Sequence, residues 1–308
     1  MYKQFYGLKR SPFEISPDPK FYFATPLHNE ALASLVYGVK KRKGFVVTTG
    51  EVGTGKSLLV RCFLQWLTKN QIPFSHIFNT RLSPLEFLQY FVADLGMPVV
   101  SNKAELLIQL NHYLIAQYRK GSTTVLVVDE GQLLDWEVLE EIRLLTNLET
   151  AEQKLLQIIL VGQPELEQKL DSAGLRQLKQ RITFRCRLKA LSEQQTQSYI
   201  SHRLEIAGAN SHARTLFPEL TMKAIAHYSR GIPRLINTLC ENALIDGYGR
   251  QVDSITPEMV VQIAADSRLE SSPHCELVND SFDPNALVND LFTTIESSIP
   301  QDEKKIAG

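Results

Sequence analysis

The sequence predicts an α/β fold, a three-layer core built on a parallel β-sheet, followed by a smaller helical subdomain. The first observation is an alternation: between residues 45 and 188, short β-rich runs alternate with segments whose apolar residues recur at helical spacing. Strands that alternate with helices are typical of a parallel sheet covered by helices on both faces. The second observation is that this alternation stops after Ala190, and only helical patterns follow as far as residue 266.

The expected strands are five short runs. The first, residues 45–49, is predicted to be a buried strand, and the next three lie at residues 74–78, 125–128 and 155–161. The fifth, residues 182–188, alternates polar and apolar side chains, which predicts a half-exposed strand at the edge of the sheet. The expected helices lie at residues 29–43, 57–69, 84–95, 103–120, 136–148 and 164–170 in the core, and at 192–208, 221–230, 233–247 and 256–266 in the helical subdomain.

Composition divides the chain into three parts. Residues 1–190 are predicted to form the α/β domain, which begins with a proline- and aromatic-rich arm over residues 1–29. Two roles are equally possible for this arm: a strap that packs over the core, or a segment that contacts the ligand. Residues 191–268 are predicted to form the helical lid subdomain. From residue 269 the apolar density falls and eight acidic residues accompany two lysines, so an acidic, disordered tail is expected. Within the tail, residues 283–295 also have the pattern of a short amphipathic helix that docks elsewhere.

Bulk composition limits the functional classes. The 308 residues are 44% hydrophobic, enough for a sizeable core, and their formal net charge of −1 gives no argument for a nucleic-acid or membrane partner. The four cysteines are far apart and form no CxxC pair, so reduced thiols are expected rather than a disulfide framework or a zinc site. No signal-peptide pattern is present, and no run reaches the roughly 18 apolar residues that span a membrane. We therefore expect a soluble cytoplasmic protein with no direct membrane span.

The strongest chemical signal is a glycine-rich loop between the strand at 45–49 and the helix at 57–69. It matches the pattern G-x-x-x-x-G-K-[ST], whose glycines let backbone N–H groups approach phosphate oxygens. The lysine of this pattern reaches the β- and γ-phosphates, and the hydroxyl that follows it ligates Mg²⁺. The predicted nucleotide-binding residues are Gly50, Glu51, Val52, Gly53, Thr54, Gly55, Lys56, Ser57 and Leu58.

A second signal is the apolar run 125–128, which ends in two acids. Asp129 is predicted to hold Mg²⁺, usually through a water molecule bound to the ion. Glu130 is predicted to orient or deprotonate the water that attacks the phosphate. Because the carboxyl ends of parallel strands converge on one crevice, these acids are expected beside the glycine loop. The alternative is a strand end that carries a solvated acid pair.

Two further polar residues are candidates for contacts near the γ-phosphate. Gln163 follows the strand at 155–161, where a polar side chain can sense that phosphate or position the water; the alternative is a helix-entry turn made by Gly162 and Pro164. Arg234 lies at the start of a helix of the subdomain, where a positive charge opposes the helix dipole and so favours a functional reason. The alternative for Arg234 is an ion pair with an acid such as Glu241.

The predicted edge strand and the loop before it contain four arginines. Arg176 and Arg181 flank that loop, and Arg181, Arg185 and Arg187 are expected on one face of the strand. An arginine at such an edge can reach a neighbouring subunit's nucleotide as an arginine finger. For Arg185 and Arg187 a solvated basic face is the preferred interpretation.

These motifs together resemble an AAA+ ATPase, more narrowly the ExeA/GspA type of general secretion pathway ATPase with its MshM pilus-biogenesis relatives. The resemblance covers residues 1 to about 268. It rests on motifs that occur in order: the stretch from Phe5-Tyr6-Gly7-Leu8 to His28-Asn29-Glu30-Ala31, the glycine loop, Asp-Glu-x-Gln at 129–132, Gly-Gln-Pro-Glu-Leu at 162–166, Leu-Arg-x-Leu-x-x-Arg-Ile at 175–182 and Gly-Ile-Pro-Arg-Leu-Ile-Asn at 231–237.

The resemblance implies a core of five parallel strands with a helical lid, and homo-oligomers that bind ATP and Mg²⁺ at subunit interfaces. It also implies that ATP turnover helps to assemble or open an envelope-spanning secretion or pilus machine, with the protein peripheral at the inner membrane through its partners. The roles it implies are Lys56, Ser57, Asp129 and Glu130 at the site, Gln163 as first sensor, Arg234 as second sensor, and Arg176 or Arg181 as the arginine finger.

Three departures from the family accompany the resemblance. The first sensor is more often Asn, Ser or Thr than Gln, which puts the role of Gln163 in doubt, and Gly131 stands where Ala is commoner. ExeA-type proteins can carry a transmembrane segment and a peptidoglycan-binding domain. Neither is expected here, so contact with the envelope is expected through partners.

Two other functions remain alternatives. ATPases of the TniB/TnsC type share this core and regulate DNA transposition, and such a protein would present a basic patch to DNA. The part of the chain before the acidic tail is only mildly basic, and the N-terminal stretch favours secretion over DNA. The second alternative is a nucleotide-switched scaffold with very slow hydrolysis, against which the intact Glu130 argues.

Overall fold

The structure, a computed structural model, describes residues 1–78, 81–209 and 213–269. Its centre is a sheet of five parallel strands in the order β2-β3-β4-β1-β5. The three inner strands, β1 (Phe45–Gly50), β3 (Thr124–Val128) and β4 (Leu156–Gly162), are buried along their whole length. The outer strands are β2 (Phe74–Ile77) and β5 (Phe184–Leu188), and both alternate buried with more exposed residues. The predicted parallel sheet and its half-exposed edge strand are confirmed.

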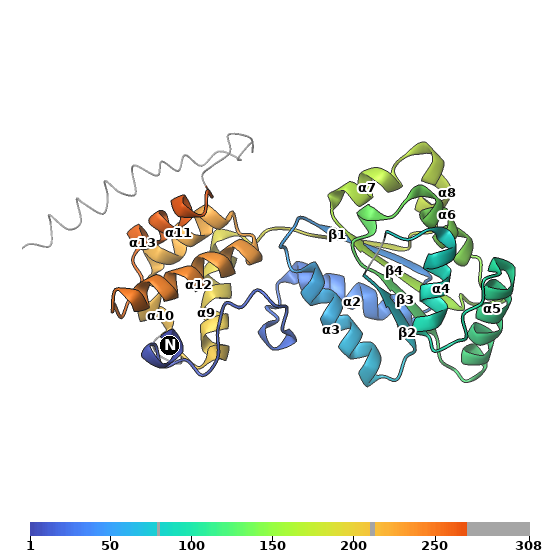
Figure 1. Ribbon diagram of the computed structural model, residues 1–308, viewed down its shortest axis with the longest axis horizontal. Helices are drawn as coiled ribbons and strands as arrows, with labels where there is room; N and C mark the ends of the chain where they lie inside the picture. Colours follow the sequence, from blue (N-terminus) through green and yellow to red (C-terminus); the bar gives the residue numbers. More distant parts are fainter. Residues whose placement is uncertain (79–80, 210–212, 270–308) are drawn as a thin grey trace, which may run out of the picture. The chain divides into compact units, whose positions relative to one another are not determined.

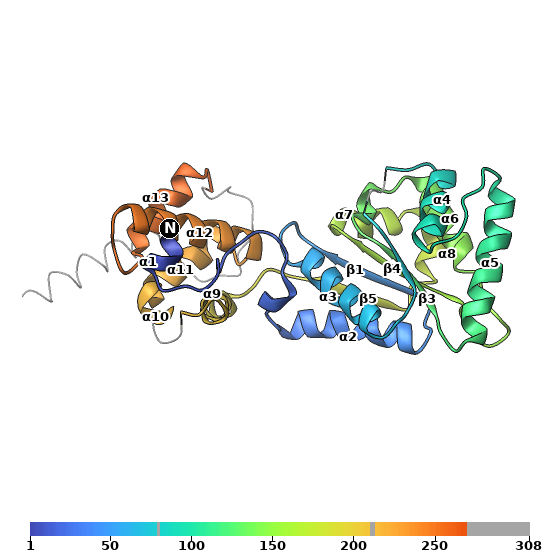
Figure 2. The same cartoon turned by 60° about the horizontal axis from the view of Figure 1, so that its bottom comes forward.

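Helices cover both faces of the sheet and complete three layers (Figures 1 and 2). On one face, α2 (Pro26–Lys40) and α3 (Lys56–Lys69) pack on the side chains of Val46, Val125 and Val127. The residues that alternate with these face the other core. The helices on that second face are α4 (Pro84–Asp94), α5 (Lys103–Arg119), α6 (Trp136–Leu145), α7 (Pro164–Leu170) and α8 (Arg176–Lys179), with the short 3-10 turns η2 (Gly131–Leu133) and η3 (Ala173–Leu175).

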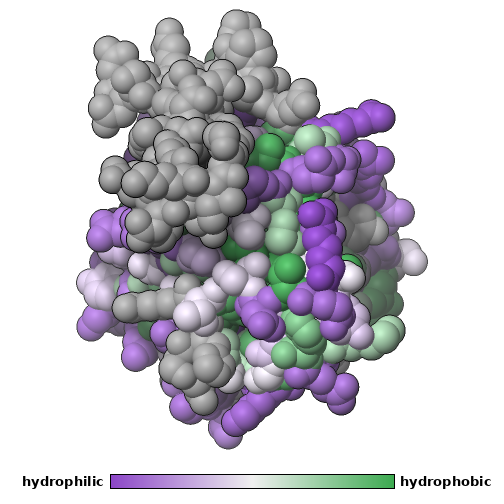
Figure 3. Space-filling model, turned by 90° about the vertical axis from the view of Figure 1, so that its left-hand side faces the viewer, coloured by the Kyte–Doolittle hydropathy of each residue, from purple (hydrophilic) through white to green (hydrophobic). Residues whose placement is uncertain are grey.

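The helical subdomain has a hydrophobic core of its own. Its helices are α9 (Glu193–Ala207), α10 (Ala213–Leu216), α11 (Glu219–Ser229), α12 (Pro233–Gly249) and α13 (Pro257–Asp266). Figure 3 shows the face of the molecule that the helical subdomain forms, where hydrophobic residues lie between hydrophilic ones. The exposed large apolar residues of the bundle are Leu220, Ile245 and Val261.

The N-terminal arm packs into the core of the helical subdomain before it reaches the sheet. Leu8 and Phe13 are buried in the same cluster as α9, α11 and α12, and the ring of Phe13 lies 5.9 Å from that of Phe217. The arm contains the short helix α1 (Tyr2–Phe5) and the turn η1 (Pro19–Phe21). The arm is thus a packing strap for at least half its length. The division of the chain at residues 190 and 268 remains our proposal.

Element ends differ from the sequence prediction where side chains cap the backbone. Helix α2 begins at Pro26 rather than at residue 29, because the Thr25 side chain accepts a hydrogen bond from the backbone N–H of His28. Helix α6 ends at Leu145, three residues earlier than expected, and β5 begins at Phe184 rather than at residue 182. The loop expected before β5 contains η3 and α8.

Several sequence predictions concern features that the described residues test only in part. No helix within the described ranges is both long and apolar enough to cross a membrane. Cys62, Cys186 and Cys240 are free thiols. The predicted tail helix at 283–295 lies outside the described residues.

Replacing Phe13 by alanine is expected to destabilise the protein by about 3–5 kcal/mol, because it leaves a cavity in a core that cannot close fully. The measurement is urea denaturation followed by circular dichroism. The matched control is Ile15→Ala in the same arm, since Ile15 is 59% exposed. Equal stabilities of the two variants would contradict the role of the arm as a packing strap.

Candidate functional site

The glycine loop joins the end of β1 to the start of α3 through backbone angles that favour glycine. Gly53 has φ +82° and Gly55 has φ +101°, and Gly55 is the residue before the first turn of α3. Space is limiting as well as conformation. A Cβ on Gly53 would lie 2.8 Å from the Cβ of Arg234, and one on Gly55 would lie 3.0 Å from His28 Nε2. The loop therefore has room for glycine alone at both positions.

Lys56 lies inside the curve of this loop. Its Nζ donates hydrogen bonds to the carbonyl oxygens of Gly50 (2.7 Å) and Glu51 (2.9 Å), and only 7% of the residue is exposed. Burial lowers the pKa of this ammonium group, while the carboxylates of Glu130 and Asp129 oppose that shift. The lysine is thus held by two loop carbonyls, close to two acids.

The two acids at the end of β3 both interact electrostatically with Lys56. Burial raises the pKa of Asp129, while a hydrogen bond of 2.9 Å from the backbone N–H of Glu130 and the charges of His76 and Lys56 act in the opposite direction. Glu130 has a left-handed backbone (φ +53°), which is uncommon for a residue other than glycine. The strand end therefore bends sharply, and the Glu130 side chain reaches the pocket that Lys56 lines.

Glu130 is bound by two amide side chains. Gln132 Nε2 donates to Glu130 Oε2 at 2.6 Å, and Gln163 Nε2 donates to the same oxygen at 3.4 Å. Gln163 follows β4, the strand that lies beside β3 in the sheet. The structure therefore brings the predicted acid and the predicted sensor together.

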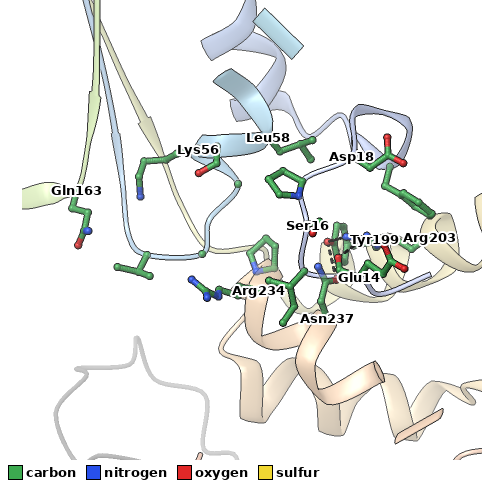
Figure 4. A pocket seen from close by; sticks show the side chains of 18 of the residues that line it. Glu14, Ser16, Asp18, Lys56, Leu58, Gln163, Tyr199, Arg203, Arg234 and Asn237 are labelled. Carbon is green, nitrogen blue, oxygen red and sulfur yellow. Dashed lines mark hydrogen bonds between the residues drawn. The ribbon is translucent and has the colours of Figure 1, made fainter. Parts of the chain in front are cut away.

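One pocket connects the loop, the strand ends, the arm and the helical subdomain (Figure 4). Lys56 and Gln163 lie at one end, and Ser16, Tyr199, Arg203 and Asn237 lie at the other. Among the sequence-predicted residues, those that line it are Val52, Gly53, Gly55, Lys56, Ser57, Leu58, Glu130, Gln163 and Arg234. The remaining residues of the loop, Gly50, Glu51 and Thr54, contribute to its internal hydrogen bonds.

Arg234 is placed at this pocket by the first turn of α12. Its backbone N–H donates to the carbonyl oxygen of Gly53 at 3.2 Å, so the helix begins in contact with the glycine loop. In Figure 4 its guanidinium group points toward the end of the pocket where Lys56 and Gln163 lie. Glu241, the alternative partner of Arg234, instead accepts a hydrogen bond of 2.7 Å from the Tyr2 hydroxyl.

The other predicted arginines lie away from the pocket. Arg176 begins α8 and is exposed, and Arg181 donates to Asn147 Oδ1 at 3.1 Å. Arg185 is exposed on β5 and forms an ion pair with Glu167 of α7. Arg187 is exposed on β5, as expected.

His28 supports the glycine loop through a contact with the Thr54 carbonyl oxygen, a role that the sequence analysis missed. Its ring lies between Thr25 and Thr54: Nε2 is 3.0 Å from the Thr54 carbonyl oxygen and Nδ1 is 2.6 Å from Thr25 Oγ1. A carbonyl can only accept, so Nε2 carries the proton and Nδ1 of the neutral ring accepts from the threonine hydroxyl. Burial lowers the pKa of His28, which favours this neutral form.

Arg203 ties the arm to the helical subdomain, and the sequence analysis missed it too. This buried side chain of α9 donates to the carbonyl oxygens of Pro12 (2.5 Å) and Glu14 (3.4 Å) and to the Tyr199 hydroxyl (2.6 Å). Its guanidinium group also lies 4.6 Å from the centre of the Phe21 ring. These contacts hold the arm segment that forms a wall of the pocket.

Comparison with known proteins agrees with this geometry. The AAA domain family matches residues 39–170. The chain is 44% identical over 253 residues to general secretion pathway protein A of Aeromonas hydrophila, a match that covers 81% of the chain. The chain is similar to AAA+ ATPases of the ExeA/GspA type. This match spans 45% of the length of the Aeromonas protein, less than half of it.

Several solved structures share the fold of this chain at low sequence identity. A structure of Drosophila ORC bound to DNA aligns with a TM-score of 0.64 and 18% identity, covering 87% of the chain and 66% of that protein. Cdc6p from Pyrobaculum aerophilum aligns with a TM-score of 0.61 and 16% identity, covering 81% and 70%. The Aeropyrum pernix ORC2 protein aligns with a TM-score of 0.58 and 15% identity, covering 82% and 72%. The predicted AAA+ fold is confirmed.

Protonation of His28 is expected to destabilise the protein at acid pH. The folded state binds this proton more weakly than the unfolded chain, so the stability that neutral His28 contributes is complete above the unfolded pKa of about 6.5 and is lost as the pH falls through the lower folded pKa. The free energy of unfolding should therefore fall more steeply below about pH 6.5 in the wild type than in His28→Gln. Urea denaturation at a series of pH values measures both slopes, and equal slopes would contradict the assignment.

Proposed function

We propose that this chain binds ATP with Mg²⁺ and hydrolyses it to ADP and phosphate. The observation that carries the proposal is the meeting of Lys56 and Ser57 from the glycine loop, Glu130 and Gln163 from neighbouring strand ends, and Arg234 from the helical subdomain around one pocket. Hydrolysis of a triphosphate needs positioned phosphates, a positioned water and positive charge where negative charge develops. This set of residues supplies each of them.

At the loop end of the pocket, backbone N–H groups and the N-terminus of α3 would bind the phosphate oxygens. In the structure the Lys56 ammonium donates hydrogen bonds to two loop carbonyls. When ATP binds, it would turn toward the β- and γ-phosphates. The water oxygen then attacks the γ-phosphorus, the bond from that phosphorus to the β–γ bridging oxygen breaks, and Glu130 accepts the proton of the water. Arg234 would stabilise the charge on the γ-phosphoryl oxygens.

The residues beside Lys56 suit a magnesium ion. Mg²⁺ prefers oxygen ligands and is usually held in nucleotide sites by one or two protein groups, with substrate phosphates and water completing the shell. Ser57 lines the pocket, and the half-buried carboxylate of Asp129 interacts with the charge of Lys56. When bound, Mg²⁺ would neutralise charge on the β- and γ-phosphate oxygens.

The opposite end of the pocket suits the nucleoside. Residues 14–18 of the arm, Phe21 and the Tyr199–Arg203 pair of α9 give it aromatic and polar walls, which is what a planar heterocycle with edge donors and acceptors needs. The arm would thus contribute to ligand binding as well as to packing. We propose adenine as the base because the proteins that this chain resembles are ATPases.

We propose that the active form is a homo-oligomer in which a neighbour completes each site. Arg176 and Arg181 lie outside the pocket of their own chain, which supports a role for one of them at the pocket of the next subunit. The oligomer would act on secretion or pilus assembly proteins of the cell envelope, from the cytoplasmic side of the inner membrane. The name of the Aeromonas relative, general secretion pathway protein A, supports this partner class.

A gel-shift assay with duplex DNA and ATP distinguishes this function from regulation of DNA transposition. The secretion proposal expects no tight binding that depends on ATP, because the formal net charge of the chain is −1 and phosphate contacts dominate the affinity of proteins for DNA. Tight ATP-dependent binding at physiological salt would favour the DNA function instead.

Replacing Lys56 by alanine is expected to abolish nucleotide binding, whereas Glu130→Gln should retain binding and lower kcat about 100-fold or more. The first change removes the charge that meets the phosphates, and the second removes only the proton acceptor. Fluorescent-nucleotide titration and phosphate release measure the two effects. Wild-type turnover by Glu130→Gln would exclude Glu130 as the base.

Mixing inactive subunits tests the shared site. Arg181→Ala is expected to lower kcat by a factor on the order of 1,000 while leaving nucleotide binding intact, because a finger stabilises charge only during transfer. A mixture of Arg181→Ala and Lys56→Ala subunits should regain part of the activity, since some interfaces combine an intact loop with an intact finger. Arg176→Ala is the parallel variant. If neither arginine variant loses activity, the proposed finger is wrong.

A further inference from the structure

Gln132 occupies the turn that follows the two acids of β3. It lies in η2, and its carboxamide has two partners on different elements. Oε1 accepts a hydrogen bond of 2.9 Å from the backbone N–H of Gln163, and Nε2 donates one of 2.6 Å to Glu130 Oε2. This one side chain therefore links Glu130 after β3 to Gln163 after β4, and both of these residues line the pocket.

The orientation of the Gln132 amide is fixed by its partners. The backbone N–H of Gln163 can only donate, so the oxygen of the carboxamide must face it and the nitrogen must face Glu130. A flipped amide would place an N–H against an N–H and an oxygen against a carboxylate. The geometry thus aims a donor at Glu130.

The turn that carries Gln132 is held from two sides. Lys169 of α7 donates to the carbonyl oxygens of Gln132 (2.8 Å) and Leu134 (2.7 Å). Gly131 lies so close to β4 that a Cβ would be 2.7 Å from Leu160 Cδ1. The glycine that departs from the commoner alanine therefore lets the turn lie against the neighbouring strand.

We propose that Gln132 is a positioning residue that holds the Glu130 carboxylate and links it to Gln163. The proposal rests on the proposed role of Glu130 in hydrolysis. A carboxylate that accepts a short hydrogen bond at one oxygen has a fixed plane, so its lone pairs keep their direction toward the attacking water. The same amide also accepts a hydrogen bond from the Gln163 backbone N–H. A shift of the end of β4 would therefore also move the Glu130 carboxylate.

Two substitutions of similar size separate positioning from simple support of the turn. Gln132→Met removes both hydrogen bonds. Gln132→Glu keeps an acceptor for the Gln163 N–H but places a carboxylate oxygen against Glu130 Oε2. Gln65→Met is the matched control, because Gln65 is exposed on α3. All are compared with the wild type by phosphate release over a range of ATP concentrations and by thermal unfolding.

We expect Gln132→Met and Gln132→Glu to lower kcat about 10–100-fold with KM for ATP changed less than about 3-fold, and Gln65→Met to match the wild type. In a Glu130→Ala background, Gln132→Met should cause no further loss, because a residue that acts through Glu130 has nothing left to position. Wild-type kcat in Gln132→Glu, or a further loss in the Glu130→Ala background, would overturn the proposal.

Failure of this inference is distinguishable from failure of the proposed function. If Glu130→Ala has little turnover while Gln132→Met has wild-type kcat, only the positioning role is wrong. If Glu130→Ala itself keeps wild-type turnover, the proposed role of Glu130 is wrong, and the positioning role falls with it.

Discussion

The turn between β1 and α3 is the constraint on which the rest of the structure depends. Its left-handed glycines carry no Cβ that could pack against a neighbour, so hydrogen bonds from other elements hold the loop in place. His28 donates to the Thr54 carbonyl from one side, and the N–H of Arg234 donates to the Gly53 carbonyl from the other. A phosphate-binding loop is thereby tied to the N-terminal arm and to the helical subdomain, which lie far from it in the sequence.

The same arm connects the hydrophobic core of the helical subdomain with the core on one face of the sheet. Its first half is buried among α9, α11 and α12, where Arg203 holds two of its carbonyl oxygens, and its second half leads into α2 on the sheet. A change at the pocket that moved the helical subdomain would therefore also move the arm. In this arrangement nucleotide binding is coupled to the positions of the helical subdomain and of the arm. Such coupling suits a protein proposed to act on partners.

The sequence predicted the features that depend on local rules, and it missed those that depend on distant contacts. The sheet, its edge strand and the glycine loop follow from periodicity and a short motif, and all were found at or near the expected residues. Gln132, His28 and Arg203 are ordinary polar residues in the sequence, and their importance comes from partners up to 191 positions away. The start of α2 was misplaced for a local reason instead, because the Thr25 side chain caps the helix and it begins at Pro26.

The central claim is that water attacks the γ-phosphorus of ATP in the pocket between Lys56 and Glu130. The most direct test is hydrolysis of ATP by the purified protein in ¹⁸O-labelled water with Mg²⁺, followed by mass spectrometry of both products. The account predicts that each phosphate released in a single turnover carries one ¹⁸O atom and that the ADP carries none. Label in the ADP, or phosphate release no faster than that of the Lys56→Ala protein, would contradict it.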